Sequence, residues 1–259
     1  AVTSSVGGLV GTASGFSANT DISISSSFFS HDTAAVDAIA NEPTIYTTSA
    51  KTDIELKDIR TFRNAGWDIV ASEATNPYPS ITMNDTPSWI MPYLELVYNN
   101  FLATGSTATL SSGAGGAINF ANDGTLTLIP TTSSGYLVSD FKVKLQENAG
   151  DLNVDKTVSW SDFKLVLDTT GNININAEMT ATSTASLTMN TGAGKVIKAS
   201  FNDDGTFKGK IDVAGTGELK INGDVYTRIN NVTELQAINN NIETIGGYDY
   251  VTGHYYLGA

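Results

Sequence analysis

The side chains with catalytic chemistry are few, and they are scattered along the sequence. His31 and His254 are the only side chains that titrate near neutral pH, and they lie near opposite ends of the chain. Two distant histidines and no cysteine do not supply the three or four clustered ligands of a zinc site. Ser161 and Lys164 have Ser-x-x-Lys spacing, but the companion motifs of such enzymes are missing. These residues therefore predict no catalytic centre and no cofactor.

Carboxylates are the remaining candidates for acid–base chemistry. Asp203 with Asp204, or Asp151 with Asp155, could serve a polysaccharide lyase or glycosidase, because those enzymes work with carboxylates in a groove. The chain has 27 acidic residues, however, so pairs of this kind arise by chance. The cluster of basic and calcium-binding residues that is typical of pectate-type lyases is not visible either. The sequence therefore favours a non-enzymatic protein.

Two further binding-site patterns, a calcium loop and a phosphate-binding loop, are not fulfilled by the sequence. A calcium loop built on Asn202–Gly205 would need ligands at its first and twelfth positions, which are Ser200 and Ile211. We therefore interpret Asp203–Thr206 as a turn. A phosphate-binding loop at Val6–Gly11 would need Gly-Lys-Ser or Gly-Lys-Thr before a helix, and neither is present.

Four aromatic residues are the candidate ligand contacts. Trp67, Trp89, Tyr93 and Tyr98 lie close together in the sequence. Exposed aromatic faces would suit the rings of a carbohydrate. Aromatic side chains are more often buried, so core packing is the favoured interpretation and a sugar platform the alternative.

The composition is acidic and rich in small polar residues. Among 259 residues, 27 are acidic and 14 basic, giving a formal net charge of -13 at pH 7. This charge repels nucleic acids and anionic membrane surfaces, so neither is an expected partner. The absence of cysteine excludes disulfides, and no apolar run reaches the roughly 20 residues that span a bilayer, so no membrane insertion is expected. Such a profile is typical of a β-rich exported protein.

Six short apolar runs indicate the fold. Most of them alternate with polar residues, which places the apolar side chains on one face of a strand. None is long enough to form a core alone, so stacking each run on the next is the economical way to bury those faces. The prediction is an all-β fold, a right-handed parallel β-helix (a solenoid) with short helical insertions; an antiparallel sandwich is the alternative. The runs are Phe141–Leu145, Phe163–Leu167, Ile173–Ile175, Leu187–Met189, Val196–Lys198 and Glu218–Ile221.

Asparagines alternate with isoleucines in the third of these runs. If Ile173 and Ile175 face inward, then Asn172, Asn174 and Asn176 point outward or stack as an asparagine ladder. Both interpretations are structural.

Helix signals interrupt the strand pattern in the N-terminal part. Asp32–Ala40 is compatible with a short helix, and Thr52–Glu55 has the spacing of a capping box. The helix that follows should bury one apolar face and end at Gly66. That face consists of Leu56, Ile59 and Phe62.

A second helix is expected near the C-terminus, with turns before it. Thr233 and Gln236 repeat the capping-box spacing. Asn122–Thr125 and Asp203–Thr206 share an Asp-Gly turn before a strand. An irregular loop is expected at Glu73–Pro87, which holds three of the six prolines. The apolar stripe of the C-terminal helix is Leu235, Ile238 and Ile242, and the glycosylation acceptor patterns are Asn84–Thr86 and Asn231–Thr233.

Several strings in the sequence resemble one protein family. In order, they look like the GLUG-type repeats and successive strands of filamentous haemagglutinin-like adhesins. The resemblance divides the chain into a GLUG-like part at 1–105, a regular ladder at 106–232, and a short helix with the start of a next strand at 233–259. The strings are Gly7–Gly11, Thr61–Asp68, Trp89–Leu94, Val158–Leu165, Gly171–Ala177, Ala185–Asn190, Gly205–Asp212 and Gly217–Gly223.

The resemblance implies a function and a location. Members of this family are secreted to the bacterial cell surface by two-partner secretion, through an outer-membrane β-barrel transporter. The chain would be an internal piece of a large adhesin, a rigid stalk that displays contacts for a glycan or protein receptor on a host or bacterial surface. The irregular insert at 70–100 is the expected contact region. The alternative is a β-helix that binds or cleaves carbohydrate.

Overall fold

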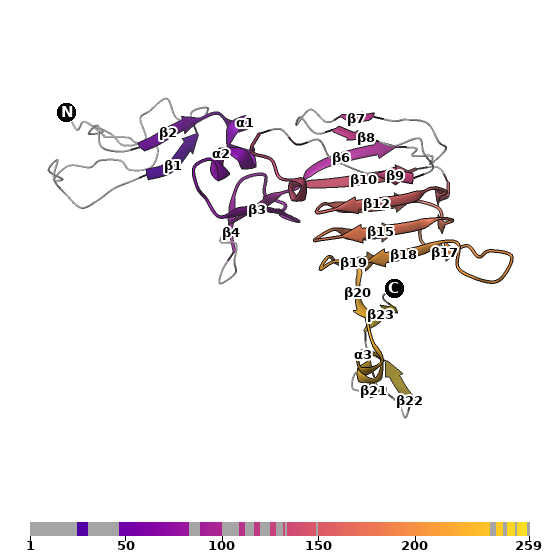
Figure 1. The fold of residues 1–259 in the computed structure, drawn as a ribbon. Coiled ribbons are helices and arrows are strands. Elements are labelled where there is room, and N and C mark those ends of the chain that lie inside the picture. The colour runs from indigo at the N-terminus through magenta and orange to yellow at the C-terminus, as the bar shows by residue number, and fades with distance from the viewer. Residues whose placement is uncertain are drawn as a thin grey trace, which may run out of the picture. The chain divides into compact units, whose positions relative to one another are not determined.

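The computed structural model describes a chain that is mostly β-structure with parallel sheets (Figure 1). It forms two compact units, Ala1–Tyr93 and Leu94–Ala259. None of the helices in the described part is long and apolar enough to cross a membrane. The residues that the structure describes are 25–30, 47–82, 89–99, 109–111, 117–119, 125–127, 132, 134–148, 150–238, 242–245, 248–251 and 253–257.

Some of the sequence predictions fall outside these residues. They include the helix at Asp32–Ala40, the turn at Asn122–Thr125, and His31. The expected division between 105 and 106 also lies there, so the three-part division of the chain stays a prediction.

The first unit combines short strands with two short helices. Strands β1 and β2 pair in parallel, β5 pairs in parallel with β3, and β4 pairs antiparallel with β5. The expected irregular insert thus contributes β4 to a sheet. The elements are β1 (Ser25–Ser30), β2 (Thr47–Lys51), α1 (Asp53–Leu56), α2 (Ile59–Arg63), β3 (Ile69–Ser72), β4 (Ser80–Ile81) and β5 (Trp89–Pro92).

The predicted capping box at Thr52 is confirmed, but the prediction of one continuous helix is wrong. Thr52 Oγ1 accepts a hydrogen bond of 3.2 Å from the Glu55 amide, and Glu55 returns it by accepting from the Thr52 amide at 2.8 Å. The helix stops after one turn, because the Asp58 carboxylate accepts from the Arg60 amide and starts α2. Gly66, with φ of +86°, follows α2.

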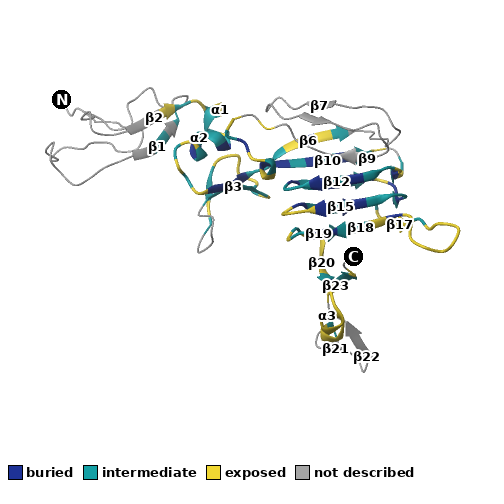
Figure 2. Cartoon of the chain, in the orientation of Figure 1, coloured by how far each residue is buried: buried dark blue, intermediate teal, exposed yellow. Residues whose placement is uncertain are grey.

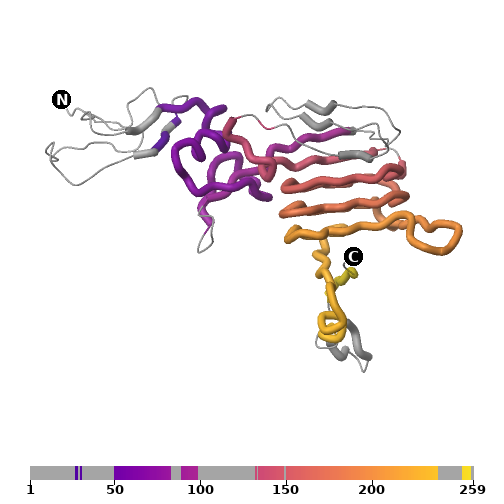
Figure 3. Tube along the Cα trace, viewed as in Figure 1, coloured from indigo at the N-terminus to yellow at the C-terminus, as the bar shows by residue number. Residues whose placement is uncertain are grey.

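The second unit holds three sheets that the chain visits in turn. Sheet A has the order β23-β20-β19-β16-β13-β10-β6, sheet B is β11-β14-β17, and sheet C is β18-β15-β12-β9. One pass runs through sheet A, then B, then C; β10, β11 and β12 make one pass, and β13, β14 and β15 the next (Figure 3). The elements from β6 to β12 are β6 (Leu94–Asn99), β7 (Thr109–Ser111), β8 (Ala117–Asn119), β9 (Thr125–Thr127), η1 (Val138–Asp140), β10 (Phe141–Glu147), β11 (Leu152–Val154) and β12 (Thr157–Ser161). The remaining elements are β13 (Lys164–Thr169), β14 (Ile173–Ile175), β15 (Glu178–Thr182), β16 (Ser186–Asn190), β17 (Ile197–Ala199), β18 (Lys210–Val213), β19 (Leu219–Ile221), β20 (Asp224–Ile229), α3 (Val232–Ala237), β21 (Ile242–Ile245), β22 (Tyr248–Val251) and β23 (His254–Leu257).

Each of the six predicted runs overlaps a strand, and these strands have parallel partners in sheets A and B. In sheet A, Val143 pairs with Leu165 and Leu165 with Leu187, so the register advances by 22 residues at both steps. In sheet B, Leu152 pairs with Ile173. Because residues paired in register on neighbouring strands point to the same side of a sheet, the apolar side chains of successive strands fall on the same face.

The alternating pattern places the core between the sheets (Figure 2). Val143, Leu165 and Leu187 are all completely buried, as is Ile173 in sheet B. Each of these side chains covers the one paired with it on the next strand, which no single strand could do. The apolar columns therefore supply the stabilising burial that the sequence pattern predicted.

The stacking direction changes after β19. Asn222 and Gly223 adopt φ of +50° and +94°, which is the conformation of a tight hairpin, and β20 returns antiparallel to β19. Strand β23 then pairs in parallel with β20.

The C-terminal helix begins two residues earlier than predicted. Its cap is Asn231, whose Oδ1 accepts from the Glu234 amide at 2.9 Å, so the predicted Thr233–Gln236 capping box is wrong. The Glu234 carboxylate accepts in return from the Asn230 amide at 2.8 Å. The predicted apolar stripe is also wrong, because Ile242 belongs to β21 and Leu235 is exposed.

Candidate functional site

The end of α2 positions the first of the four predicted ligand-contact residues. The Trp67 amide donates to the Phe62 carbonyl at 3.1 Å, just after Gly66 with its positive φ. This turn brings the Trp67 ring against Phe62, with ring centroids 5.1 Å apart. Phe62 is buried, and Phe28 on β1 meets it edge-on at 5.3 Å. Trp67 is therefore part of an aromatic cluster in the first unit.

The structure also brings Trp89 into this cluster. Trp89 opens β5 and pairs with Ile69 of β3, and its amide donates to the Asp68 carbonyl at 3.1 Å. The two indole rings lie 4.6 Å apart, centroid to centroid, with an angle of 47° between their planes. Both indoles are half-buried, so ring–ring packing occupies part of the surface that a sugar would need.

The two tyrosines lie on different units. Tyr93 follows β5 and is half-buried, and its amide donates to the Ser72 carbonyl at 3.2 Å. Tyr98 lies on β6, which belongs to sheet A of the second unit. The two indoles touch, but no single unit holds all four residues.

The candidate carboxylates of the second unit make structural hydrogen bonds. Asp151 accepts from the Asn172 amide at 2.7 Å and from its side chain at 3.0 Å. These bonds, the backbone one first, hold the pKa of Asp151 below its usual value. Asp155 accepts from Asn176 at 2.7 Å, so this pair tethers successive passes.

The second carboxylate pair, Asp203 and Asp204, belongs to the predicted turn, which is confirmed. The strand expected directly after the turn is not, because β18 begins only at Lys210. The Gly205 amide donates to the Asn202 carbonyl at 2.9 Å, and φ of Gly205 is +82°. Asp204 Oδ1 accepts from the hydroxyl and the amide of Thr206, which lowers the pKa of Asp204. Within the described ranges, no three His, Asp or Glu side chains gather where they could hold a metal ion.

The structure places the other catalytic candidates, Ser161, Lys164 and His254, in strands. Ser161 ends β12 in sheet C and Lys164 begins β13 in sheet A. His254 begins β23, where its ring lies 5.0 Å from that of Tyr226 and its Nε2 is 3.6 Å from an Asp224 oxygen. Neither arrangement pairs a nucleophile with an oriented base.

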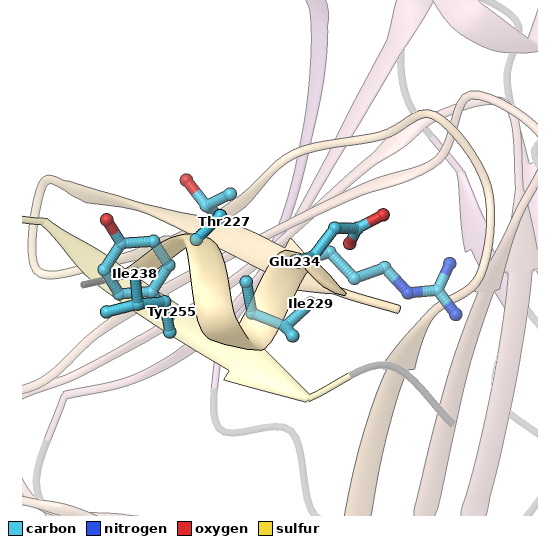
Figure 4. A pocket seen from close by; sticks show the side chains of 7 residues that line it. Thr227, Ile229, Glu234, Ile238 and Tyr255 are labelled. Atoms are coloured by element: carbon cyan, nitrogen blue, oxygen red, sulfur yellow. The ribbon is translucent and has the colours of Figure 1, made fainter. Parts of the chain in front are cut away.

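A cavity that the sequence did not predict lies between β20, α3 and β23 (Figure 4). Its volume is about 230 Å³. Tyr255 and Ile238 lie together in the close-up, at some distance from Glu234 and Ile229. No spacing of residues in the sequence predicts such a cavity, because its walls come from three separate elements. The lining residues are Thr227, Arg228, Ile229, Glu234, Ala237, Ile238 and Tyr255.

Arg228 is the charged donor of this cavity. Its Nη1 donates to the Ala214 carbonyl at 2.9 Å, and its Nη2 lies 3.2 Å from Asp212 Oδ1. Its Nε is buried and has no hydrogen-bond partner among the described residues. The pKa of Glu234 is lowered, first by the hydrogen bond from the Asn230 amide. The cavity thus has apolar walls and an ion-paired arginine.

Comparisons with known protein families, with curated proteins and with solved structures find no match to this chain.

Proposed function

We propose that the second unit is a right-handed parallel β-helix that serves as a rigid spacer and display surface. The observation that supports this proposal most directly is the repeated order of sheets A, B and C, with parallel partners in register. Parallel strands joined by a crossover are almost always right-handed, which supports the handedness. Each pass depends mainly on its neighbours, so length can be added without a larger core.

We further propose that the chain is a segment of a large secreted adhesin of the filamentous haemagglutinin-like type. The strings that resemble this family overlap strands of sheets A, B and C. Val158–Leu165 covers β12 and the start of β13, Gly171–Ala177 covers β14, and Ala185–Asn190 covers β16. This proposal includes export through an outer-membrane β-barrel transporter, a place at the bacterial cell surface, and attachment to a host or bacterial receptor.

The proposed role is non-enzymatic. Asp151, Asp155 and Asp204 are used in tethers and turns, which argues against a carboxylate pair poised for cleavage. The competing proposal is a β-helix that cleaves polysaccharide. It predicts release of new reducing ends from uronate polymers, whereas a spacer releases none.

The attachment role is tested with beads that carry the purified chain. We expect bacterial and epithelial cell layers to retain these beads more than control beads that carry an acidic protein of similar charge. The architecture is tested separately by circular dichroism, which should show mainly β-structure. Equal retention of both kinds of bead would reject the adhesin proposal, and a mainly helical spectrum would reject the β-helix.

A further inference from the structure

The cavity between β20, α3 and β23 has room for a small molecule. Its volume is about 230 Å³, whereas an apolar cavity of roughly 150 Å³ already holds benzene. Tyr255 and Ile238 form one side of it, and Ile229, which is only 6% exposed, lies with Glu234 on the other (Figure 4). A ligand that spans the cavity therefore meets an aromatic and aliphatic wall at one end and a carboxylate at the other.

Glu234 carries a charge that its hydrogen bonds use only in part. Its Oε2 accepts from the amide and the side chain of Asn230 at 2.8 and 3.1 Å, and its Oε1 accepts from Asn231 Nδ2 at 2.7 Å. A carboxylate offers about four acceptor sites, so the described residues leave one site open, on Oε1. The bond from the Asn230 amide is the first of the causes that hold the pKa of Glu234 below its usual value. The carboxylate is therefore charged at neutral pH and can accept from one more donor.

Arg228 does not neutralise this carboxylate. Its guanidinium turns to sheet C, where Nη1 donates to the Ala214 carbonyl at 2.9 Å and Nη2 lies 3.2 Å from Asp212 Oδ1. Its effect is the smallest of the causes that lower the pKa of Glu234. Because Arg228 and Asp212 cancel as a pair, Glu234 leaves a net negative charge beside the cavity. The formal net charge of the whole chain, -13, has the same sign, so the site attracts cations and repels anions.

We propose that this cavity binds a small primary amine with an apolar body. The apolar body packs on Tyr255 and Ile238, and the ammonium group donates to the open site on Glu234 Oε1. A neutral molecule of the same shape gains the apolar contacts alone, and an anion is repelled. The inference goes beyond the display role and does not rest on it, because the binding groups come from α3 and β23 rather than from the regular passes.

The test is titration of the isotope-labelled full chain with phenethylamine at neutral pH, followed by the NMR shifts of the backbone amides. We expect saturable shifts at Thr227, Ile229 and Tyr255, with a Kd of about 1 mM that rises at high salt. Phenethyl alcohol, the neutral counterpart, should bind at least about fivefold more weakly. Phenylpropionate, the anionic counterpart, should bind more weakly still.

Substitutions in the cavity separate the two ends of the site. Glu234→Gln keeps an oxygen for the Asn230 amide but loses the charge, so it should weaken phenethylamine about fivefold and leave phenethyl alcohol unchanged. Ala237→Leu adds volume to the cavity wall and should weaken both ligands. The controls are Glu178→Gln, which removes the same charge from sheet C, and Val232→Leu, at a position of α3 that is 68% exposed. Both controls should bind within about twofold of the parent chain.

Several results would overturn the proposal. They are the absence of a saturable shift at the cavity amides, equal affinity for the amine and the alcohol, and an equal loss of binding in Glu178→Gln. Tighter binding of Nα-acetyl-lysinamide than of phenethylamine would overturn it in favour of a lysine side chain of a partner protein. Because the titration uses no cells, none of these results bears on the attachment role, which has its own assay.

Discussion

Asn174 donates a side-chain hydrogen bond of 2.8 Å to Oδ1 of Asn153, its register partner on the neighbouring strand. Asn172 and Asn176 make the corresponding bonds to Asp151 and Asp155. The asparagines therefore point outward, which was one of the two interpretations, and they form a ladder of cross-strand bonds to one asparagine and two aspartates. These bonds tie successive strands together outside the apolar core, where water competes for them.

Removing one step of this ladder should have a modest cost. We expect Asn174→Ala to lower the free energy of unfolding by about 1 kcal/mol, because Asn153 loses its donor. Urea unfolding followed by circular dichroism measures the change. Ser159→Ala, on the outer face of β12, is the control and should change the midpoint little. Equal midpoints for parent and Asn174→Ala would show that the ladder does not contribute.

Close stacking at one corner should make a glycine essential. A Cβ atom at Gly217 would lie 1.7 Å from the Ala185 carbonyl oxygen of the preceding pass. Gly217→Ala must therefore push two passes apart, at a cost of about 1–3 kcal/mol. Gly150→Ala is the matched control, because nothing lies within 4 Å of its Cβ position. Thermal unfolding of both variants tests this, and equal melting temperatures would contradict the stacking.

The charge of Glu55 should make α1 sensitive to acid. The Thr52 amide and the Lys51 ammonium, in that order, lower the pKa of Glu55 from 4.5 to about 2. A carboxyl whose pKa is lower in the folded state than in the unfolded state stabilises the fold at any pH above its unfolded-state pKa. That contribution is lost as the pH falls from about 4.5 through 2. Amide exchange in α1 should therefore accelerate across this range. Carbon NMR of the Glu55 carboxyl checks the pKa, and a titration near 4.5 would refute the cap.

The N-cap of α3 is Asn231 in the structure, whereas the sequence predicted Thr233. Asn231→Ala should destabilise α3 by about 1 kcal/mol, since the Glu234 amide loses its acceptor. Thr233→Ala lies inside the helix and should have little effect. Hydrogen exchange of the α3 amides distinguishes the two variants. Faster exchange in Thr233→Ala than in Asn231→Ala would restore the cap predicted from the sequence.

Trp67 should behave as a core residue of the first unit. Trp67→Ala removes its contacts with Phe62 and Trp89, and we expect a loss of about 2–4 kcal/mol. Ile81→Ala, at a side chain that is 65% exposed, should cost far less. Denaturant unfolding monitored by hydrogen exchange within the first unit compares the two. A stable Trp67→Ala protein that has lost binding to a glycan array would instead favour the sugar platform.

Local sequence patterns predicted the structure correctly where a pattern is compatible with only one arrangement of its side chains. The alternation in Phe141–Leu145 and Ile173–Ile175 predicted strands and their inward faces, because only one register buries all the apolar members. The Thr52–Glu55 spacing predicted a capping box correctly, but the same spacing at Thr233–Gln236 did not, because Asn231 caps α3 instead. The pattern did not show that Asp58 would end α1, because an aspartate can lie inside a helix or, as here, accept from the amide two residues later and start a new helix.

Composition and residue pattern were enough to predict an acidic, β-rich chain built from short strands that cannot bury their faces alone. Which strands lie side by side could be seen only in the folded chain, because pairing depends on contacts between residues more than 20 positions apart. The tertiary structure also decided that Trp67 packs on Trp89 while Phe201 and Phe207 stay exposed. The physical reason is that side-chain type fixes the tendency to be buried, whereas the available neighbours fix whether burial happens.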